Sequence, residues 1–148
     1  MGGDAVKIFL AWIKASRLPS QSYIFLPILA GQAIHVMQGG ELDWMLFFLV
    51  HLYGLFMQLY IVYANDYADV ETDRINRSFT IFSGGSRVLV DGDVSRRFLG
   101  GAGIFMAAAS VGVGVFLTVA YGRMWVLPLI LFGVVLLWMY SFAPIRLS

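Results

Sequence analysis

Four long apolar stretches without a charged side chain constrain this chain more than any other feature of its sequence. They cover residues 18–37, 44–64, 98–121 and 124–143, and none of them contains Asp, Glu, Lys or Arg. A helix needs about 20 mostly apolar residues to cross a bilayer, and one charged residue at its centre costs roughly 2.5–3.5 kcal/mol on insertion scales. The sequence therefore predicts an all-α, polytopic transmembrane helical bundle with four spans. Two prolines in the first stretch favour a kinked helix there, packed among neighbours that satisfy the freed carbonyls.

The composition agrees with lipid as the solvent and excludes several classes of protein. The chain is 59% hydrophobic and 13% charged, whereas soluble domains are about 45–50% apolar and about 25% charged. Its net charge of +1 provides no basic field for binding nucleic acid. Because the chain contains no cysteine, disulfides, thiolate metal sites and cysteine nucleophiles are excluded.

The basic residues alternate along the chain and predict an orientation. Lys7, Lys14 and Arg17 precede the first stretch, five arginines lie in the loop 65–97, and the links on the other side carry only Arg123. Cytoplasmic loops of membrane proteins carry the excess of Lys and Arg. The chain is therefore predicted to be an integral protein of the cell membrane, with both termini and the loop 65–97 in the cytoplasm.

Residues 1–17 have a helical pattern of their own within what is predicted to be a single domain, 1–148. Val6, Phe9, Leu10 and Ile13 recur at helical spacing, as in an amphipathic helix that lies on a membrane surface. A simple lead-in to the first span explains the pattern equally well.

Three polar residues continue the second stretch into the following loop at a spacing of four. Asn65, Asp69 and Asp73 fan over about 80° of a helix surface, because successive residues turn by about 100°. Counting back by sevens gives Gln58 and His51 inside the apolar stretch. One face of this helix is thus predicted to be polar along much of its length and to point at the bundle interior or a water-filled cavity.

This polar comb, defined as Asn65, Asp69 and Asp73, has the chemistry of a magnesium site. Mg²⁺ prefers one or two carboxylates together with waters and substrate phosphates to an all-protein cage. The loop that follows is glycine-rich and contains an arginine, so that its backbone N–H groups could face an anion. The comb and loop together predict a site for a metal–diphosphate complex, which includes Arg74 and the run Ser83-Gly84-Gly85-Ser86-Arg87.

Simpler interpretations of the same residues stay open. An acidic run at a helix end is usually a solvated loop, and a pair of glycines alone is weak evidence for a phosphate site. His51 and Gln58 are more often interhelical hydrogen-bonding groups than catalysts.

Several segments resemble the UbiA-type intramembrane prenyltransferases. Residues 65–77, Asn-Asp-Tyr-Ala-Asp-Val-Glu-Thr-Asp-Arg-Ile-Asn-Arg, resemble the first aspartate-rich motif of that family. Residues 82–89, Phe-Ser-Gly-Gly-Ser-Arg-Val-Leu, resemble the branch that includes the menaquinone-pathway dihydroxynaphthoate prenyltransferases. Residues 17–19, Arg-Leu-Pro, are similar to the family's first helix, and 140–148, Tyr-Ser-Phe-Ala-Pro-Ile-Arg-Leu-Ser, to the segment that closes its fourth.

The resemblance implies a magnesium-dependent transferase that moves a prenyl chain from its diphosphate to an acceptor, often an aromatic quinone precursor. It implies that Asn65, Asp69 and Asp73 are catalytic and hold the metal–diphosphate. Tyr60, Tyr63 and Tyr140 become candidates for an aromatic lining, although tyrosines near helix ends are more often interfacial anchors. The substrate-binding residues it implies are Arg17, Asp66, Arg74, Ser83, Gly84, Gly85, Arg87, Tyr140 and Arg146.

The chain departs from the family in one respect. The family has about nine helices and a second aspartate-rich motif in its second half, whereas this sequence has no Asp or Glu after Asp93. The chain thus resembles the amino-terminal half of the enzyme, which alone is not expected to be competent. An incomplete sequence, a split enzyme with a separate partner and a homodimer of halves all remain open. The competing function is a non-catalytic four-helix membrane subunit whose acidic loop binds a cation or a partner protein.

Overall fold

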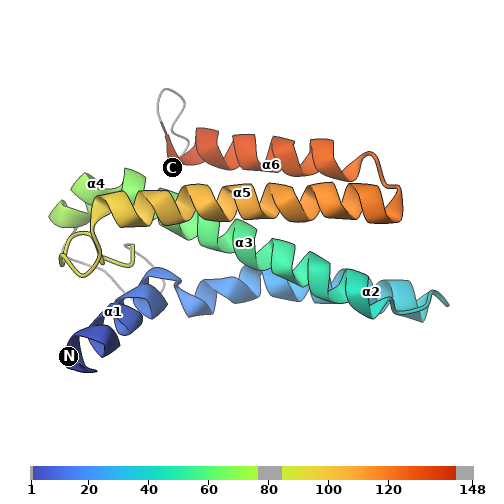
Figure 1. The fold of residues 1–148 in the computed structure, drawn as a ribbon, viewed down its shortest axis with the longest axis horizontal. Coiled ribbons are helices and arrows are strands. Elements are labelled where there is room, and N and C mark those ends of the chain that lie inside the picture. The colour runs from blue at the N-terminus through green and yellow to red at the C-terminus, as the bar shows by residue number, and fades with distance from the viewer. Residues whose placement is uncertain (1, 77–84, 143–148) are drawn as a thin grey trace.

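The computed structural model describes residues 2–76 and 85–142 of the chain, and every regular element in these ranges is helical. This confirms the all-α prediction. The helices 22–37, 44–68, 96–121 and 126–141 run alternately back and forth along one long axis, as the colours in Figure 1 show. In order, the elements of the described residues are α1 (Gly2–Ala15), the 3₁₀ turn η1 (Leu18–Gln21), α2 (Ser22–Met37), α3 (Trp44–Ala68), α4 (Val70–Ile75), α5 (Arg96–Tyr121) and α6 (Val126–Ser141).

Two helices, α3 with 25 residues and α5 with 26, are long and apolar enough to cross a membrane. The other two predicted spans form shorter helices, since α2 and α6 each have 16 residues. At 1.5 Å per residue such a helix is about 24 Å long, which is less than the roughly 30 Å of a hydrocarbon core. The first stretch is shorter than predicted because it opens with the 3₁₀ turn η1, which contains Pro19. The count of four spans therefore stays a prediction.

Glycines allow the helices to pack closely. A Cβ atom added to Gly100 of α5 would lie 2.9 Å from the ring of Tyr67 on α3, and one added to Gly114 would lie 2.6 Å from Ile130 on α6. Between α2 and α3, a Cβ on Gly54 would lie 2.7 Å from Ile28. Small residues at such positions let the backbones approach closely. In lipid, where no hydrophobic effect holds helices together, this close packing provides the van der Waals contacts that do.

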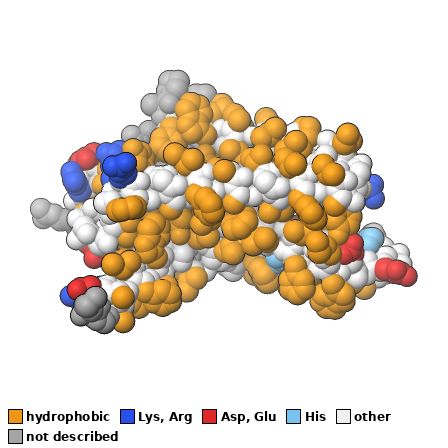
Figure 2. Space-filling model, viewed as in Figure 1, with side chains coloured by type: hydrophobic (Ala, Val, Ile, Leu, Met, Phe, Trp, Pro, Cys, Tyr) orange, Lys and Arg blue, Asp and Glu red, His pale blue; other side chains and the backbone are white. Residues whose placement is uncertain are grey.

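Charged side chains gather at the two ends of the molecule, and hydrophobic side chains cover the middle (Figure 2). One end holds α1, α4 and the residues that lead into α5; the other holds the α2–α3 and α5–α6 links (Figure 1). This is the distribution expected when a central band faces lipid and both ends reach the head groups and water.

Helix α1 packs against the end of the bundle that holds α4, through a small buried cluster. Its residues Ala11 and Ala15 contact Val88 and Val94 of the loop before α5, together with side chains from α3 and α5. Lys14 adds ion pairs to Asp91 at 2.7 Å and Asp93 at 3.1 Å. The opposite face of α1 is apolar and exposed, with Val6, Phe9 and Leu10 at 57%, 64% and 56% exposure. The location of residues 1–17 on a membrane surface stays a prediction.

Candidate active site

The polar comb lies at the end of the bundle that holds α1 and α4, where α3 is followed directly by α4. Asp69 ends α3 and begins α4, with φ −96° and ψ 9°. The helical hydrogen bonds continue through this bend, because the N–H of Asp69 donates to the carbonyl of Asn65 and the N–H of Asp73 to that of Asp69, both at 2.8 Å. Asn65, Asp69 and Asp73 are thus one turn apart, as the spacing predicts.

Asn65 opens onto a pocket of about 430 Å³ between η1, α2, α3 and α6. Arg17, Gln58 and Tyr140 line the same pocket, although they come from three separate parts of the sequence. The side-chain oxygen of Asn65 accepts a hydrogen bond from the hydroxyl of Ser141 at 2.6 Å. This leaves the second lone pair of the amide oxygen for another partner.

Asp66 is the most enclosed carboxylate of the site, with a relative exposure of 3%. It forms an ion pair with Arg17 and accepts hydrogen bonds from the backbone N–H of Ser86, at 3.2 Å, and from the Ser86 hydroxyl. Arg17 itself has a left-handed backbone, with φ 44°. Asp66 therefore joins three segments: the turn before η1, helix α3 and the loop that leads to α5.

Asp73 is buried on α4 and lies against the same loop. Gly85 has φ +73°, and any Cβ at this position would collide with the Asp73 carboxylate. Both facts favour glycine. It adopts a positive φ at little cost, and it has no Cβ to collide with the carboxylate. Arg87 donates from Nη1 to the carbonyls of Asp73 at 2.8 Å and Asn76 at 3.2 Å. It thus binds the end of α4 beside the comb.

The comb carries an excess of negative charge around Asp73. Burial raises the pKa of the Asp73 carboxyl, and the negative charges of Asp66 and Asp69 raise the pKa further, while Arg17 and Arg87 lower it. Carboxylates that repel one another in this way are stabilised by a bound cation. Within residues 2–76 and 85–142, no three Asp, Glu or His side chains are grouped as metal ligands. The two carboxylates and one amide of the comb still fit Mg²⁺, which completes its shell with water and phosphate oxygens.

The other predicted site residues lie in different places. Arg74 is 58% exposed and pairs with Glu71 on its own helix at 3.1 Å. Tyr60 and Tyr63 face away from Asn65 and line a separate groove, whereas Tyr140 lines the Asn65 pocket. Three predicted substrate-binding residues, Ser83, Gly84 and Arg146, lie outside the described residues.

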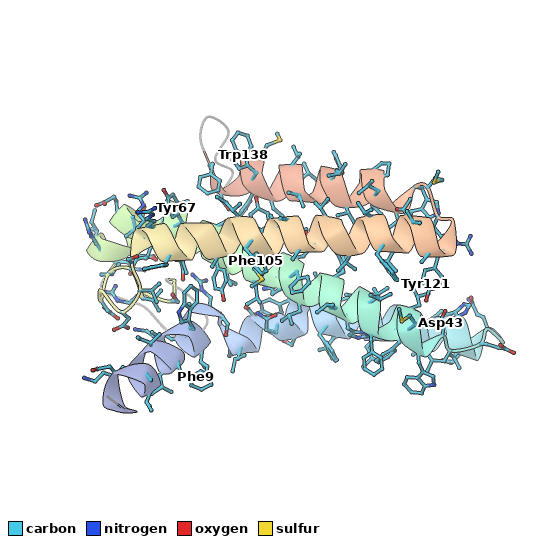
Figure 3. The ribbon with its side chains drawn as sticks, in the orientation of Figure 1. Phe9, Asp43, Tyr67, Phe105, Tyr121 and Trp138 are labelled. Atoms are coloured by element: carbon cyan, nitrogen blue, oxygen red, sulfur yellow. The ribbon has the colours of Figure 1, made fainter. Side chains whose placement is uncertain are left out.

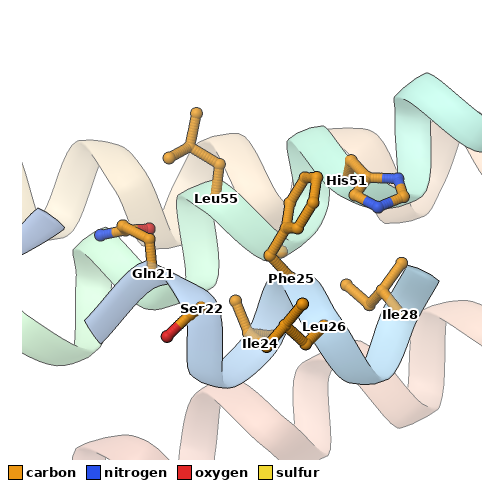
Figure 4. A pocket seen from close by; sticks show the side chains of 9 residues that line it. Gln21, Ser22, Ile24, Phe25, Leu26, Ile28, His51 and Leu55 are labelled. Carbon is orange, nitrogen blue, oxygen red and sulfur yellow. The ribbon is translucent and has the colours of Figure 1, made fainter. Parts of the chain in front are cut away.

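Two residues of the predicted polar face of α3, Gln58 and His51, contact η1 and α2 respectively. Gln58 donates to the Ser20 hydroxyl at 3.2 Å, as an interhelical hydrogen-bonding residue does. Nδ1 of His51 lies 2.8 Å from the Phe47 carbonyl of its own helix. The ring contacts Phe25 of α2 at 4.5 Å between centroids and lines an apolar pocket of about 330 Å³ (Figure 4). His51 is therefore separate from the pocket that Asn65 and Gln58 share.

Two serines contact the site: Ser86 was predicted only as part of the run 83–87, and Ser141 was not among the predicted site residues. Ser141 binds Asn65 across 76 positions of sequence, and Ser86 binds Asp66 across 20. A serine has no distinctive spacing, so only its place within the motif-like segments 82–89 and 140–148 pointed toward it.

Comparison with known proteins identifies the family to which the chain belongs. The model of the UbiA prenyltransferase family matches residues 24–148, which include the comb and the loop after it. The match begins after Arg17. Neither a search of curated proteins nor a search of solved structures found a match. The match covers most of the chain, and the chain therefore belongs to the UbiA prenyltransferase family.

Proposed function

We propose that this integral membrane protein supplies the diphosphate-binding half of a site for magnesium-dependent prenyl transfer to an aromatic acceptor, a quinone precursor. The observation that carries the proposal is the pocket shared by Asn65, Arg17 and Tyr140. It brings one end of the comb, a cationic side chain and an apolar wall together at one end of an apolar bundle.

The comb would hold the metal and its diphosphate. Asn65, Asp69 and Asp73 supply hard oxygen donors, and burial together with the charges of Asp66 and Asp69 raises the pKa of Asp73, so that a cation beside it would stabilise its ionised form. When bound, Mg²⁺ would neutralise charge on the leaving diphosphate.

Arg17 is placed to bind the diphosphate directly. One of its terminal nitrogens is held by Asp66, while its buried Nε has no hydrogen-bond partner within the described part of the chain. Leaving a buried donor unsatisfied costs about 1–3 kcal/mol, so an anion in the pocket would recover this energy. Asp66 is then a positioning residue, which aims Arg17 rather than contacting substrate itself.

The reaction that fits these groups begins with cleavage of the allylic C–O bond, whose electron pair leaves with the diphosphate. The ring carbon of the acceptor then bonds to the allylic carbon, and the ring loses a proton. The developing positive charge on the prenyl chain requires protection from water. Ile61, Val62 and Leu137 line the pocket and would exclude water, while Tyr140 offers the negative face of its ring to a cation.

A second set of carboxylates would complete the site. The comb provides few negative charges to hold several metal ions against one diphosphate, and no Asp or Glu follows Asp93 in the sequence. The remainder of a longer chain, a partner half-chain or a second copy of this chain would supply them. The cytoplasmic location of the comb belongs to the same proposal and is supported by the arginines of the loop 65–97.

The test is binding of a prenyl diphosphate to the full chain in detergent, with and without Mg²⁺. Asp69→Ala should weaken magnesium-dependent binding at least about tenfold, since a charge-assisted contact contributes roughly 1.5–3 kcal/mol. Glu71→Ala is the matched control, because Glu71 is exposed and on the same short helix. Equal affinity of wild type and Asp69→Ala would contradict the proposal. Binding of Mg²⁺ with no affinity for prenyl diphosphate would instead favour the non-catalytic subunit.

A further inference from the structure

We infer that a second groove, on the other side of α3, binds an anionic phospholipid. The groove lies between α3, α5 and α6, has a volume of about 490 Å³, and shares no lining residue with the Asn65 pocket. Its existence does not depend on the proposed prenyl transfer. The lining residues that carry the inference are Tyr67, Arg96, Arg97, Gly101, Ile104 and Trp138.

The body of the groove is apolar and open to the surroundings. Tyr67 and Trp138 lie toward the same end of the bundle (Figure 3), and both contact Phe142, with ring centroids 6.1 Å and 6.4 Å away. Ile104 is 73% exposed and Trp138 48%. A Cβ on Gly101 would meet nothing within 4 Å, so α5 leaves space there. An acyl chain fits a shallow apolar groove of this kind along a membrane-crossing helix.

The mouth of the groove is cationic. The Arg96 guanidinium stacks over the Tyr67 ring, 4.5 Å from its centroid, and Nη2 donates to the Tyr67 carbonyl at 3.3 Å. Only one of its five N–H donors is used by this bond. Arg97 is exposed, and neither Asp nor Glu is among the described residues that line the groove. No described acidic side chain forms an ion pair with either arginine. Two such charges at the mouth of an apolar groove complement one phosphate with its chain.

The location selects a phospholipid over other anions. Arg96 and Arg97 begin α5, a helix long enough to cross the membrane, so they lie at the level of the head groups. Basic pockets between membrane helices bind anionic head groups there. A magnesium diphosphate, in contrast, needs carboxylates, and none is found among the described residues that line this groove.

The test measures lipid binding to the purified full chain, by native mass spectrometry and by thermal stability in detergent. Phosphatidylglycerol should bind and raise the unfolding temperature, while phosphatidylcholine with the same chains should do so much less. The double variant R96Q/R97Q should weaken phosphatidylglycerol binding by about fivefold per arginine. R123Q, just beyond the opposite end of α5, removes one arginine outside the groove as a control and should bind like wild type.

A second variant tests the apolar body without touching the charges. Gly101→Leu should block the acyl chain while keeping the helix, since leucine is a better helix former than glycine. Inorganic phosphate and a prenyl diphosphate without Mg²⁺ serve as competitors. Equal binding of the two phospholipids, unchanged binding in R96Q/R97Q, or displacement of the lipid by inorganic phosphate alone would overturn the inference. Magnesium-dependent prenyl diphosphate binding should be intact in R96Q/R97Q, which separates this site from the comb.

Discussion

Asp66 and Asp73 lie only seven positions apart in one acidic run, yet they have opposite surroundings. Both are buried, at 3% and 8% exposure. Asp66 has a cation and two hydrogen-bond donors against it, whereas the charge neighbours of Asp73 include two carboxylates that raise its pKa. The burial of a carboxylate therefore does not reveal its role. Its partners do: Asp66 is paired with Arg17 and Ser86 within the protein, whereas we propose that Asp73 helps to bind a cation.

The comparison predicts the largest effect for Asp66→Asn. This change leaves Arg17 partly buried beside a neutral amide, and breaking a buried ion pair from one side costs about 3–5 kcal/mol. The unfolding temperature in detergent should therefore decrease strongly, and the affinity for the diphosphate should decrease as well.

A double-mutant cycle separates positioning from direct contact for this residue. Removing both charges, in Arg17→Gln with Asp66→Asn, should restore much of the stability but not diphosphate binding, because the two groups are coupled. If Asp66→Asn has the unfolding temperature of wild type and loses only magnesium affinity, Asp66 is a metal ligand. Its assignment as a residue that positions Arg17, in contrast to Asp73, would then be wrong.

Gly85→Ala should have an intermediate effect. The substitution adds a Cβ that collides with the Asp73 carboxylate and places alanine at φ +73°, where a non-glycine residue costs about 1–2 kcal/mol. Stability and magnesium affinity should both decrease. Gly92→Ala is the control, because Gly92 also has a positive φ, of +77°, but has nothing within 4 Å of the new Cβ. Equal loss in the two variants would show that backbone strain alone acts, and that contact with Asp73 does not matter.

Asp73→Asn should have the smallest effect on stability, and in the opposite direction. Because folding raises the pKa of this carboxyl above 3.8, the folded protein binds its proton more tightly than the unfolded chain does. The stability this group contributes is full at low pH and is lost as pH rises through the raised pKa. At neutral pH without Mg²⁺, the amide should therefore raise the unfolding temperature slightly.

The magnesium response of the same variant provides the contrast. Mg²⁺ should stabilise wild type at neutral pH, less so as the pH falls toward the raised pKa of Asp73, and should have little effect on Asp73→Asn. If Asp73→Asn is less stable than wild type without Mg²⁺ and is still stabilised by the ion, then Mg²⁺ binds at a site that does not include Asp73.

The sequence predicted the two long helices and the spacing of the comb well. The stretches 44–64 and 98–121 lie within α3 (Trp44–Ala68) and α5 (Arg96–Tyr121), because long apolar windows leave few alternatives to a helix. The ends of the other two stretches were less predictable. The first begins with a 3₁₀ turn after Arg17, whose left-handed backbone has no signal in the hydropathy. Tyr60 and Tyr63 were grouped with Tyr140, but the packing of α5 and α6 against α3 separates them.

By itself, the sequence determined that this chain is helical and apolar and that one helix carries Asn65, Asp69 and Asp73 at one-turn intervals, because hydropathy and helical periodicity are local properties. Only the tertiary structure decided which acidic residue is neutralised. The partners of Asp66 lie 49 and 20 positions away, and Asn65 meets Ser141 across 76. Electrostatic pairing depends on distance in space, and the packing of the helices, the turn before η1 and the loop before α5 sets that distance.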